Sequence, residues 1–550
     1  MKRFRRHKLN RAVVAVCAGL GSAVAVRAQV LPQVPTAPLN AASEATPAFP
    51  VGGASAPAPQ RLPAVPPSTY IVPSVAVLVT QSSNANFGAA NAAQSDTIVE
   101  VVPRLFLTTE HARWQARANL SLDGQYYVRG AEPNVLSPQG TASVHSELVD
   151  RLLFFDAGMS AQRYATSPYV GQGGPVQSTS YTSTQWRISP YIDRVLRPGL
   201  RLTARSDDTW TTVSNAPAAV GLTGGRYLDQ TLRLEQMPLD WGYTLAARQT
   251  YATYTDEPYA WLRDSTARGI INYAFTPRLI LGLIGGGEKV QAFGAEKTAS
   301  IYGVRGQWTA GPQGDARFTV ERRYFGTGWN LQASAGTPLA RLSVAWNRDA
   351  ISALSPLASA DNSATNLTLL LDKILVGQYP NPFQRAQAVQ SLLGSAGLPP
   401  GLSTSGGFYT SSSVLQNNLV VTGLVLRQRD SFALSLYRNR TEDLYLPGQQ
   451  LLQLIQSTSA DNIQSGAAFN FGHRLTPLDN LNLTVQRELD TGFGLNQGNE
   501  ARQTNFIVQL DHRFSLRTIG IIGVRRRLLV STQVGSANET GLFAGFVHRF

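Results

Sequence analysis

Apolar and polar residues alternate with a period of two along most of the chain beyond residue 69. The longest run covers 113–129, where Trp114 and Leu120 share one face while Arg117 and Asp123 share the other. Successive side chains of a β-strand point to opposite faces, so this period predicts strands. Shorter runs of the same kind occur at 228–235, 317–324 and 506–514. The only break on the apolar face of the second of these runs is Arg322.

Alternation by itself fits two folds. In a soluble sandwich the apolar face points inward, whereas in a membrane barrel it meets lipid and the polar face lines the lumen. An export signal, an aromatic terminal strand and aromatic residues near strand ends favour the barrel, because interfacial girdles are aromatic. The girdle candidates are Tyr126, Tyr127, Tyr251, Tyr254, Trp308, Trp329 and Trp346. We expect an all-β fold, a transmembrane antiparallel β-barrel of about 20 strands (18–22) with a short helical insert. Our assignment counts about 21 strands. Bacterial single-chain barrels have an even number of strands, so this assignment has merged or added one.

The chain ends in an alternating strand with Phe546, His548 and Phe550 on one face and Arg549 on the other. An apolar strand left at a sheet edge invites aggregation, whereas in a closed barrel the last strand pairs with the first. This ending is similar to the C-terminal strand of bacterial outer-membrane barrels. We therefore predict that Phe546, His548 and Phe550 form the signal read by the barrel-assembly machinery.

Residues 1–28 read as a signal peptide, with a basic start, an apolar stretch and small residues at Val26 and Ala28. The only cysteine, Cys17, raises the alternative of a lipoprotein, but Val16 stands where a small residue is preferred. Residues 29–68 are rich in Pro and Ala and predict a disordered periplasmic linker, either a tether or a partner-binding segment. The barrel should occupy 69–550, in the bacterial outer membrane.

Charge excludes a nucleic-acid-binding protein. The formal net charge is +13, but seven of the basic residues lie in the first 28 positions, which contain no acid. Without them the charge falls to +6, and the remaining basic residues are scattered along the strands rather than clustered.

The predicted connections are of two kinds, as barrel turns and loops are. Short turns contain proline, and we place them on the periplasmic side with the C-terminus: 196–199, 275–278, 336–339 and 475–478. Longer polar links should lie outside: 207–225, 445–461 and 491–500.

The segment 351–413 is too long for a structureless loop. Leu367, Leu370, Leu371 and Ile374 have the spacing of an amphipathic helix. Asn381 and Pro382 then open a second predicted helix that carries Ala386, Val389 and Leu393. Counting strands back from the C-terminus places this insert at the extracellular mouth, as a lumen plug or as an external cap.

Over about 70–550 the chain resembles the outer-membrane barrel proteins associated with PEP-CTERM/exosortase systems. The resemblance rests on Ile71-Val72-Pro73-Ser74-Val75, Ile188-Ser189-Pro190-Tyr191, the Thr-Pro turns and an LLxxIL...NPFxRAxAVxxLLxxxGLP pattern at 370–399. It implies an outer-membrane barrel encoded near exopolysaccharide and exosortase genes, with no catalytic residues. The chain departs from the family at His548, where an aromatic residue is more usual.

The residues give no sign of an enzyme. His473, His512 and His548 lie on apolar strand faces beside phenylalanines, while His111 and His145 fall in predicted connections without a Ser or Asp at a recognisable spacing. Asp511 precedes His512, but neighbours on a strand point to opposite faces. No metal-ligand cluster, phosphate loop or nucleophile elbow is present in the sequence, so we expect no catalysis, metal or cofactor.

Two function classes remain. One is a channel or export conduit, for which polysaccharide is a candidate solute, and the other is a non-conducting structural or docking protein of the outer membrane. Expected partners are outer-membrane lipid, the assembly machinery, and exopolysaccharide or envelope proteins. Charged residues on polar strand faces are the candidates to line the lumen: Arg117, Asp123, Arg187, Arg201, Arg233, Glu235, Arg317, Glu321, Arg323, Asp511 and Arg513.

Overall fold

The computed structural model describes residues 68–170, 180–214, 224–255, 261–311, 314–352, 354, 367–375, 379, 385, 388–389, 413–446 and 460–550. The predicted signal peptide and all of the predicted linker except Ser68 lie outside the described residues.

In the described part of the chain, almost every residue belongs to one sheet of 22 strands. The first eleven strands are β1 Ser68–Ser82, β2 Asp96–Glu110, β3 Trp114–Tyr127, β4 Val135–Val149, β5 Leu153–Ala165, β6 Ser180–Arg197, β7 Leu200–Ser214, β8 Gly225–Gln236, β9 Trp241–Tyr254, β10 Trp261–Thr276 and β11 Leu279–Ala292. The others are β12 Ala295–Thr309, β13 Gly314–Arg323, β14 Gly326–Gly336, β15 Ala340–Ser352, β16 Ser413–Leu426, β17 Asp430–Asp443, β18 Asn462–Arg474, β19 Asp479–Gly492, β20 Glu500–Arg513, β21 Thr518–Ser531 and β22 Gly535–Arg549. The number is even, and our assignment of about 21 strands is one short.

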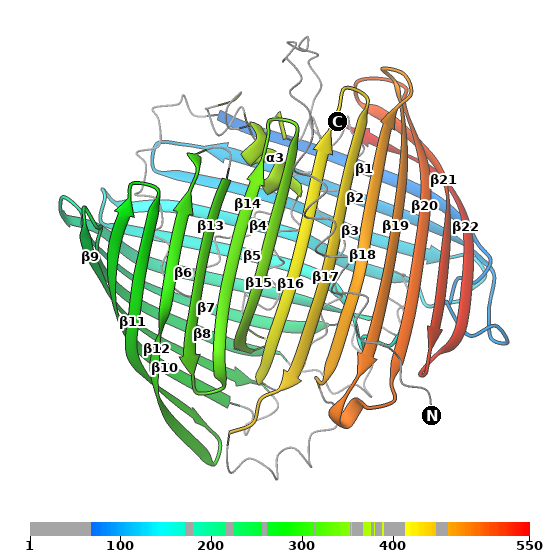
Figure 1. The fold of residues 1–550 in the computed structure, drawn as a ribbon. Helices are drawn as coiled ribbons and strands as arrows, with labels where there is room; N and C mark the ends of the chain where they lie inside the picture. The colour runs from blue at the N-terminus through cyan, green and yellow to red at the C-terminus, as the bar shows by residue number, and fades with distance from the viewer. Residues whose placement is uncertain are drawn as a thin grey trace. The chain divides into compact units, whose positions relative to one another are not determined.

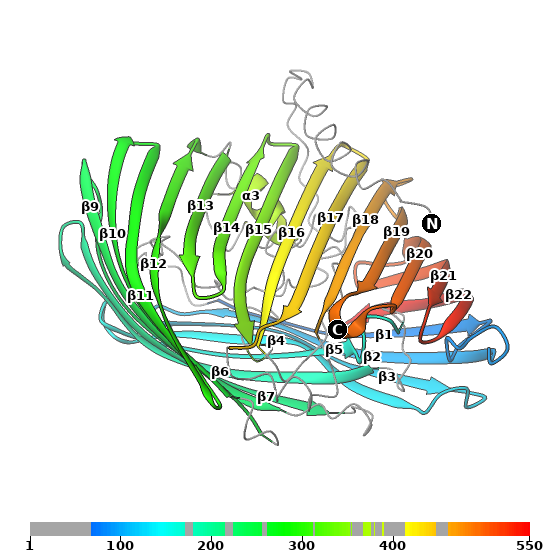
Figure 2. The ribbon, with the colours of Figure 1, turned by 60° about the horizontal axis from the view of Figure 1, so that its bottom comes forward.

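The sheet closes on itself (Figures 1 and 2). Each strand pairs antiparallel with its neighbours in sequence, and β22 pairs with β1, from Ser74 opposite Arg549 to Ser82 opposite Gly541. The final residue continues this seam, since the Phe550 N–H donates to the Pro73 carbonyl at 3.0 Å. A closed sheet has no unpaired edge, which explains how the chain can end in an apolar strand. The prediction of an antiparallel β-barrel is confirmed.

The two ends of the barrel differ in their connections. One end, which we call the short-turn end, carries two- to four-residue turns and the C-terminus, and all four predicted proline turns lie there. The opposite end, the long-loop end, carries the longer connections, among them 83–95, 166–179, 353–412 and 444–461. The predicted link 207–225 is too long, because β7 continues to Ser214 and only 215–224 connect it to β8. Three tight hairpins also lie at the long-loop end, β11–β12, β13–β14 and β21–β22.

In the described residues, α3 (Leu367–Leu375) and a 3-10 turn, η5 (Gly494–Asn496), accompany the sheet, and Arg385, Ala388 and Val389 are helical as well. The first of the two helices predicted within the insert is thus confirmed. Most of the second predicted helix lies outside the described residues. Within the described residues, no helix has both the length and the apolar character needed to cross a membrane.

Large apolar side chains remain exposed on the outer face of the sheet all around the barrel, for example Leu122 on β3, Leu283 on β11 and Ile522 on β21. Several predicted girdle residues belong to this face, including Tyr126, Tyr251, Trp308 and Trp346. Tyr127 and Tyr254 were assigned to the girdle wrongly. They are only 3% and 7% exposed and stand on the inner face. Tyr127 is one residue after the outward-facing Tyr126 and Tyr254 is three residues after the outward-facing Tyr251, so both side chains point inward.

Candidate functional site

The inner face of the barrel is identified by side chains that meet across strands that are not neighbours. Arg323 on β13 contacts Glu288 on β11 at 2.6 Å and Asp264 on β10 at 3.2 Å. Side chains on the convex side of a closed sheet spread apart, whereas those on the concave side come together. Contacts between strands that are not neighbours therefore form only inside the barrel. By alternation along each strand, this inner face carries most of the buried polar residues and the outer face carries the exposed apolar ones.

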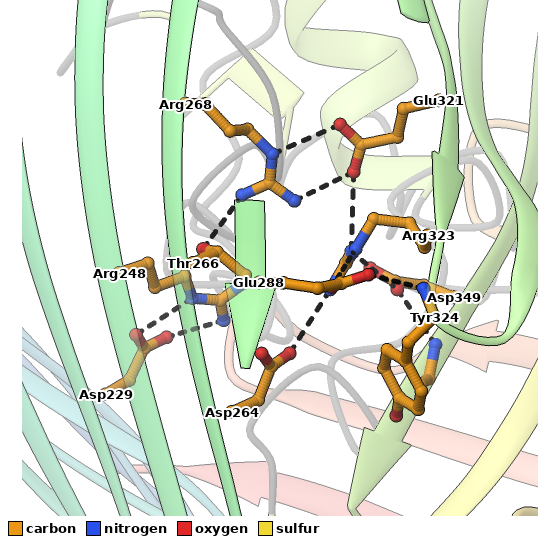
Figure 3. A network of polar contacts seen from close by, with 11 residues as sticks. Asp229, Arg248, Asp264, Thr266, Arg268, Glu288, Glu321, Arg323, Tyr324 and Asp349 are labelled. Carbon is orange, nitrogen blue, oxygen red and sulfur yellow. Dashed lines mark hydrogen bonds and ion pairs between the residues drawn. The ribbon is translucent and has the colours of Figure 1, made fainter. Parts of the chain in front are cut away.

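Figure 3 shows a charge network on the inner face of β8 to β15. Arg323 lies within 3.5 Å of Asp349 and 3.3 Å of Glu321, in addition to its two other carboxylate partners. Arg268 joins the network through Glu321 at 2.8 Å. The Arg323 and Glu288 side chains are almost completely buried, and buried charges are tolerated when they are paired in this way. The network ties together strands that the backbone ladder does not join directly.

A smaller network lies on the inner face of β4 to β7. The carboxylate of Asp156 accepts from Arg205 at 2.8 Å and contacts His145 Nδ1 at 2.7 Å. Arg205 also reaches Asp207 at 2.9 Å. The prediction that His145 falls in a connection, with no Ser or Asp at a recognisable spacing, is wrong. His145 belongs to β4, and the barrel register sets it directly opposite Asp156.

A third network crosses the seam where the barrel closes. Glu539 on β22 accepts from Ser82 on β1 at 2.7 Å and from Arg525 on β21 at 2.8 Å. Arg527 donates to the other oxygen of the same carboxylate. The seam is therefore held by a buried carboxylate as well as by backbone hydrogen bonds.

Helix α3 lies inside the barrel. Its apolar face, with Leu371 fully buried, packs in one cluster with Leu424 on β16, Ala433 on β17 and Ala468 on β18. These three wall residues stand on the inner face by alternation. Val389, from the part of the insert that follows, belongs to the same cluster.

Charged residues of α3 face two walls. The ammonium of Lys373 lies 3.3 Å from Asp315 on β13 and 3.2 Å from the hydroxyl of Ser334 on β14. Asp372 pairs with Arg385 of the insert at 2.6 Å and interacts electrostatically with Arg117 on β3. Strand β3 lies on the other side of the β1–β22 seam, far around the barrel from β13 to β18. Helix α3 thus stands between two parts of the wall.

The insert reaches both ends of the barrel. It leaves the wall at the long-loop end, where Leu354 packs against Tyr227 and Tyr254 at the ends of β8 and β9. By contrast, Asp315 and Leu424, which contact α3, are one and two residues from the short-turn ends of their strands. Figure 1 draws α3 at the end of the barrel that carries the C-terminus. The insert was expected at the long-loop mouth, but α3 lies inside the barrel near the opposite end, because the apolar wall residues that cover its buried face are there.

Other long loops also fold onto the inner wall at the long-loop end. Leu446 packs against Val290 and Tyr324, and Tyr169 packs with Phe87 and Leu529. Burial raises the pKa of the Tyr169 phenol well above its usual value, so the group stays neutral. These contacts place residues of the loops 83–95, 166–179 and 444–461 against the inner wall.

All eleven candidate lumen residues stand on the inner face by alternation, on β3, β6, β7, β8, β13 and β20. The structure brings some of them into ion pairs, since Arg233 contacts Glu235 at 2.8 Å and Arg323 contacts Glu321. Arg201 instead pairs with Asp193. The others are spread along separate strands, and their contact with a solute stays a prediction.

Sequence reasoning missed most of the network residues: Asp156, Asp193, Asp229, Arg248, Asp264, Arg268, Glu288, Asp349 and Glu539. The reason is clearest on β11. Ile284, Glu288 and Val290 all point inward, so this strand carries apolar residues on its inner face too and its alternation is weak. Asp229 and Arg248 could have been found, because their positions do alternate with apolar residues.

The histidines near the short-turn end lie on the outer face and pair across hairpins. His473 contacts Asp430 at 2.7 Å, and His512 contacts Asp479 at 2.6 Å. His548 contacts Thr518 at 2.9 Å and stacks edge-to-face against Phe550. Asp511 and His512 point to opposite faces, as their adjacency predicts. Among the described residues, no group of three or more His, Cys, Asp or Glu could hold a metal ion.

No protein family model matches the chain, and no characterised protein matches its sequence. Its fold is similar to solved barrels at low identity. The siderophore receptor PirA from Acinetobacter baumannii is 9% identical, with a TM-score of 0.44 over 88% of this chain and 81% of that one. The FrpB iron transporter from Neisseria meningitidis is 8% identical, with a TM-score of 0.45 over 87% and 81%. OccK5 (OpdH) from Pseudomonas aeruginosa is 10% identical, with a TM-score of 0.28 over 88% and 98%. The chain itself is a closed 22-stranded antiparallel β-barrel whose strand pairing alone establishes the fold.

Proposed function

We propose that this protein is an outer-membrane channel plugged by its own 353–412 insert, and that it serves as an export conduit in an exopolysaccharide/PEP-CTERM-associated system. The alternative is a non-conducting structural or docking protein of the same membrane. The proposal has three parts, the membrane, the plug and the solute, and each rests on separate observations.

The outer surface supports the membrane placement. A soluble monomer rarely exposes contiguous apolar patches of more than a few hundred square ångströms, whereas here large apolar side chains face outward on strand after strand. Closed barrels are one of the two backbone structures that can cross a bilayer, because every backbone polar group is satisfied internally. The closed sheet, its even strand number and its apolar outer face together fit a bacterial outer-membrane protein.

The position of α3 is the observation that carries the plug. A barrel of 22 strands encloses an interior too wide for wall side chains alone to fill. The insert leaves the wall at the long-loop end, yet α3 docks near the short-turn end, between the wall that holds Asp315 and the one that holds Arg117. A docked helix can be released without unfolding the barrel, because its contacts are separate from the strand ladder. That separation is what a gate requires.

Polar uncharged side chains along β17 to β19 favour a hydroxylated solute. Asn439, Asn470 and Asn482 stand on the inner face, and each has a side-chain amide oxygen with no hydrogen-bond partner among the described residues. Two of these amides are held in place by their NH₂ groups, which donate to Thr484 and Asp511. These amide oxygens are buried in this structure, so a solute would reach them only after they are uncovered, but an uncharged polar wall suits the hydroxyl groups of a sugar chain. The link to exopolysaccharide rests on this wall and on the resemblance given by the insert pattern.

Planar-bilayer recording tests the proposal. Replacing 360–402 with a short Gly/Ser linker should raise single-channel conductance several-fold over the parent chain, while shortening the 29–68 linker should leave it unchanged. Heat-modifiable gel mobility and circular dichroism would confirm that each variant is a folded barrel. Equal conductance of a folded variant and the parent would rule out the plug. Absence of current in both would support the structural or docking alternative.

The solute is tested separately on the conducting variant. A soluble neutral polysaccharide should reduce its current, whereas polyethylene glycol of similar size, which has no hydroxyls along its chain, should reduce it much less. Replacing Asn439, Asn470 and Asn482 with Leu should remove this difference. If the two polymers reduce the current equally in the conducting variant that keeps its three asparagines, the assignment of a hydroxylated solute is contradicted.

A further inference from the structure

Two arginines stand side by side on the rim of the barrel at the β13–β14 hairpin. Arg322 and Arg348 occupy outer-face positions of β13 and β15 by alternation. Their Nη1 atoms lie 3.9 Å and 3.8 Å from the point where a Cβ on Gly326 would stand. Gly326 has no side chain, so the space between the two guanidinium groups is open. Two like charges this close repel each other unless an anion lies between them.

No carboxylate in the described residues forms an ion pair with either arginine, in contrast to Arg268 and Arg323 of the inner face. Arg348 donates instead to the carbonyl of Thr327. Its guanidinium lies over the rings of Phe325 at 5.8 Å and Trp329 at 5.4 Å. Cation–π contacts of this kind hold the group in place without neutralising it. Arg348 is therefore held in place while it keeps its positive charge.

The height of the pair matches a membrane interface. Strands β13 and β14 are the shortest in the described sheet, with 10 and 11 residues. At roughly 3.3 Å per residue such a strand is about 33 Å long, and with the tilt of about 35–45° that barrel strands have it rises by about 23–27 Å. The apolar band of an outer-membrane barrel is about 25 Å tall, so the rim of this hairpin lies near the headgroups.

The side chains below the pair are those expected at that boundary. Phe318 and Val320 are exposed apolar residues on the outer face of β13. On the same face, Trp329 stands opposite both Val320 and Arg348 in the strand register, and it packs edge-to-face against Trp346 with ring centroids 5.2 Å apart. Tryptophan concentrates at the level where acyl chains meet headgroups. Exposed apolar residues, tryptophan and the two arginines thus stand together on the outer wall near this rim.

We propose that Arg322, Arg348 and the open space at Gly326 bind a phosphate group of an anionic lipid in the leaflet at the long-loop end. In a bacterial outer membrane this leaflet contains phosphorylated glycolipid. A guanidinium group binds phosphate through two parallel hydrogen bonds. A phosphate held between two guanidinium groups also offsets the repulsion between them. The inference rests on the proposed membrane placement and is independent of whether the barrel conducts.

Lipid binding to the full-length chain, purified in non-ionic detergent, tests this assignment. Native mass spectrometry should show retention of bisphosphorylated lipid A and much weaker retention of the same lipid after dephosphorylation. The double variant R322Q/R348Q should bind lipid A at least about tenfold more weakly. R194Q is the matched control, because Arg194 is an exposed arginine on the outer face of β6 near the short-turn end, and it should bind as the parent does.

R322K/R348K keeps both positive charges but lacks the guanidinium groups that form paired hydrogen bonds, and should bind lipid A with intermediate strength. If the double glutamine variant does not fold, R322Q and R348Q singly should each weaken binding. Undiminished lipid A binding by a folded R322Q/R348Q variant would overturn the site, as would equal binding of the dephosphorylated lipid. Displacement of lipid A by inorganic phosphate at equal concentration would reassign the site to free phosphate. Conductance plays no part in these measurements, so failure of the channel proposal and failure of this one remain distinguishable.

Discussion

The ammonium of Lys373 lies 3.3 Å from a carboxylate oxygen of Asp315, which joins the helix inside the barrel to the wall near its short-turn end. The remaining contacts of α3 with the wall are largely apolar, with Leu371 at their centre. These two kinds of contact can be removed independently.

If the helix plugs the barrel, Lys373→Ala should increase the fraction of time in which the channel is open, because it weakens docking without touching the strand ladder. Leu371→Asp should have a larger effect, since it places an unpaired carboxylate in an apolar contact. Lys289→Ala is the control, because Lys289 pairs with Glu296 at 2.7 Å on the outer face. Bilayer recordings measure all three. An open fraction that is the same for Leu371→Asp and the parent would show that α3 is not the gate.

The two faces of β3 should respond differently to a new charge. Leu120→Arg faces lipid near the middle of the strand and should destabilise the barrel by about 2–4 kcal/mol. Ser121→Arg faces the interior and should be nearly neutral. Urea unfolding in lipid vesicles measures both variants. Similar costs at the two neighbouring positions would reverse or abolish the assignment of the faces.

Arg323→Met should be strongly destabilising, because it leaves the carboxylates of Glu288, Asp264 and Asp349 together without their cation. Removing one partner from a buried pair costs about 3–5 kcal/mol. The deficit should shrink as the pH is lowered, because crowded carboxylates bind protons more readily in the folded barrel than in the unfolded chain. Unfolding free energies measured at several pH values check this.

The control for this prediction is Arg440→Met, which removes an exposed pair with Glu442 on the outer face and should cost about 0–1 kcal/mol. A deficit in Arg323→Met that stays constant or grows on acidification would show that the arginine does not neutralise this cluster.

Deleting Phe550 should reduce insertion into the outer membrane far more than deleting one residue of the 29–68 linker. Phe550 is exposed on the outer face, where an assembly factor can reach its ring, and its N–H completes the seam with Pro73. Membrane fractionation of cells that express each variant measures insertion. Equal insertion of the two would mean that the terminal aromatic residue has no part in assembly.

The sequence determined which residues of most strands share a face. On β3 the alternation is unbroken, and Arg117 and Asp123 stand on the inner face as the period of two requires. The proline turns, the spacing of Leu370, Leu371 and Ile374 and the aromatic ending are local signals too. Each depends on residues only a few positions apart, which is why they can be read from the sequence without a structure.

Contacts between distant residues were decided by the tertiary structure alone. His145 meets Asp156, and Glu288 meets Arg323, because barrel register and curvature bring separate strands together. Arg322 is visible in the sequence as a break in an apolar face, but its neighbour Arg348 lies two strands further on and is placed beside it by the tight turn at Gly326. The same holds for α3. Its amphipathic spacing predicts a helix that must bury one face, but only the closed barrel provides an interior surface for that face at the end opposite to where the insert begins.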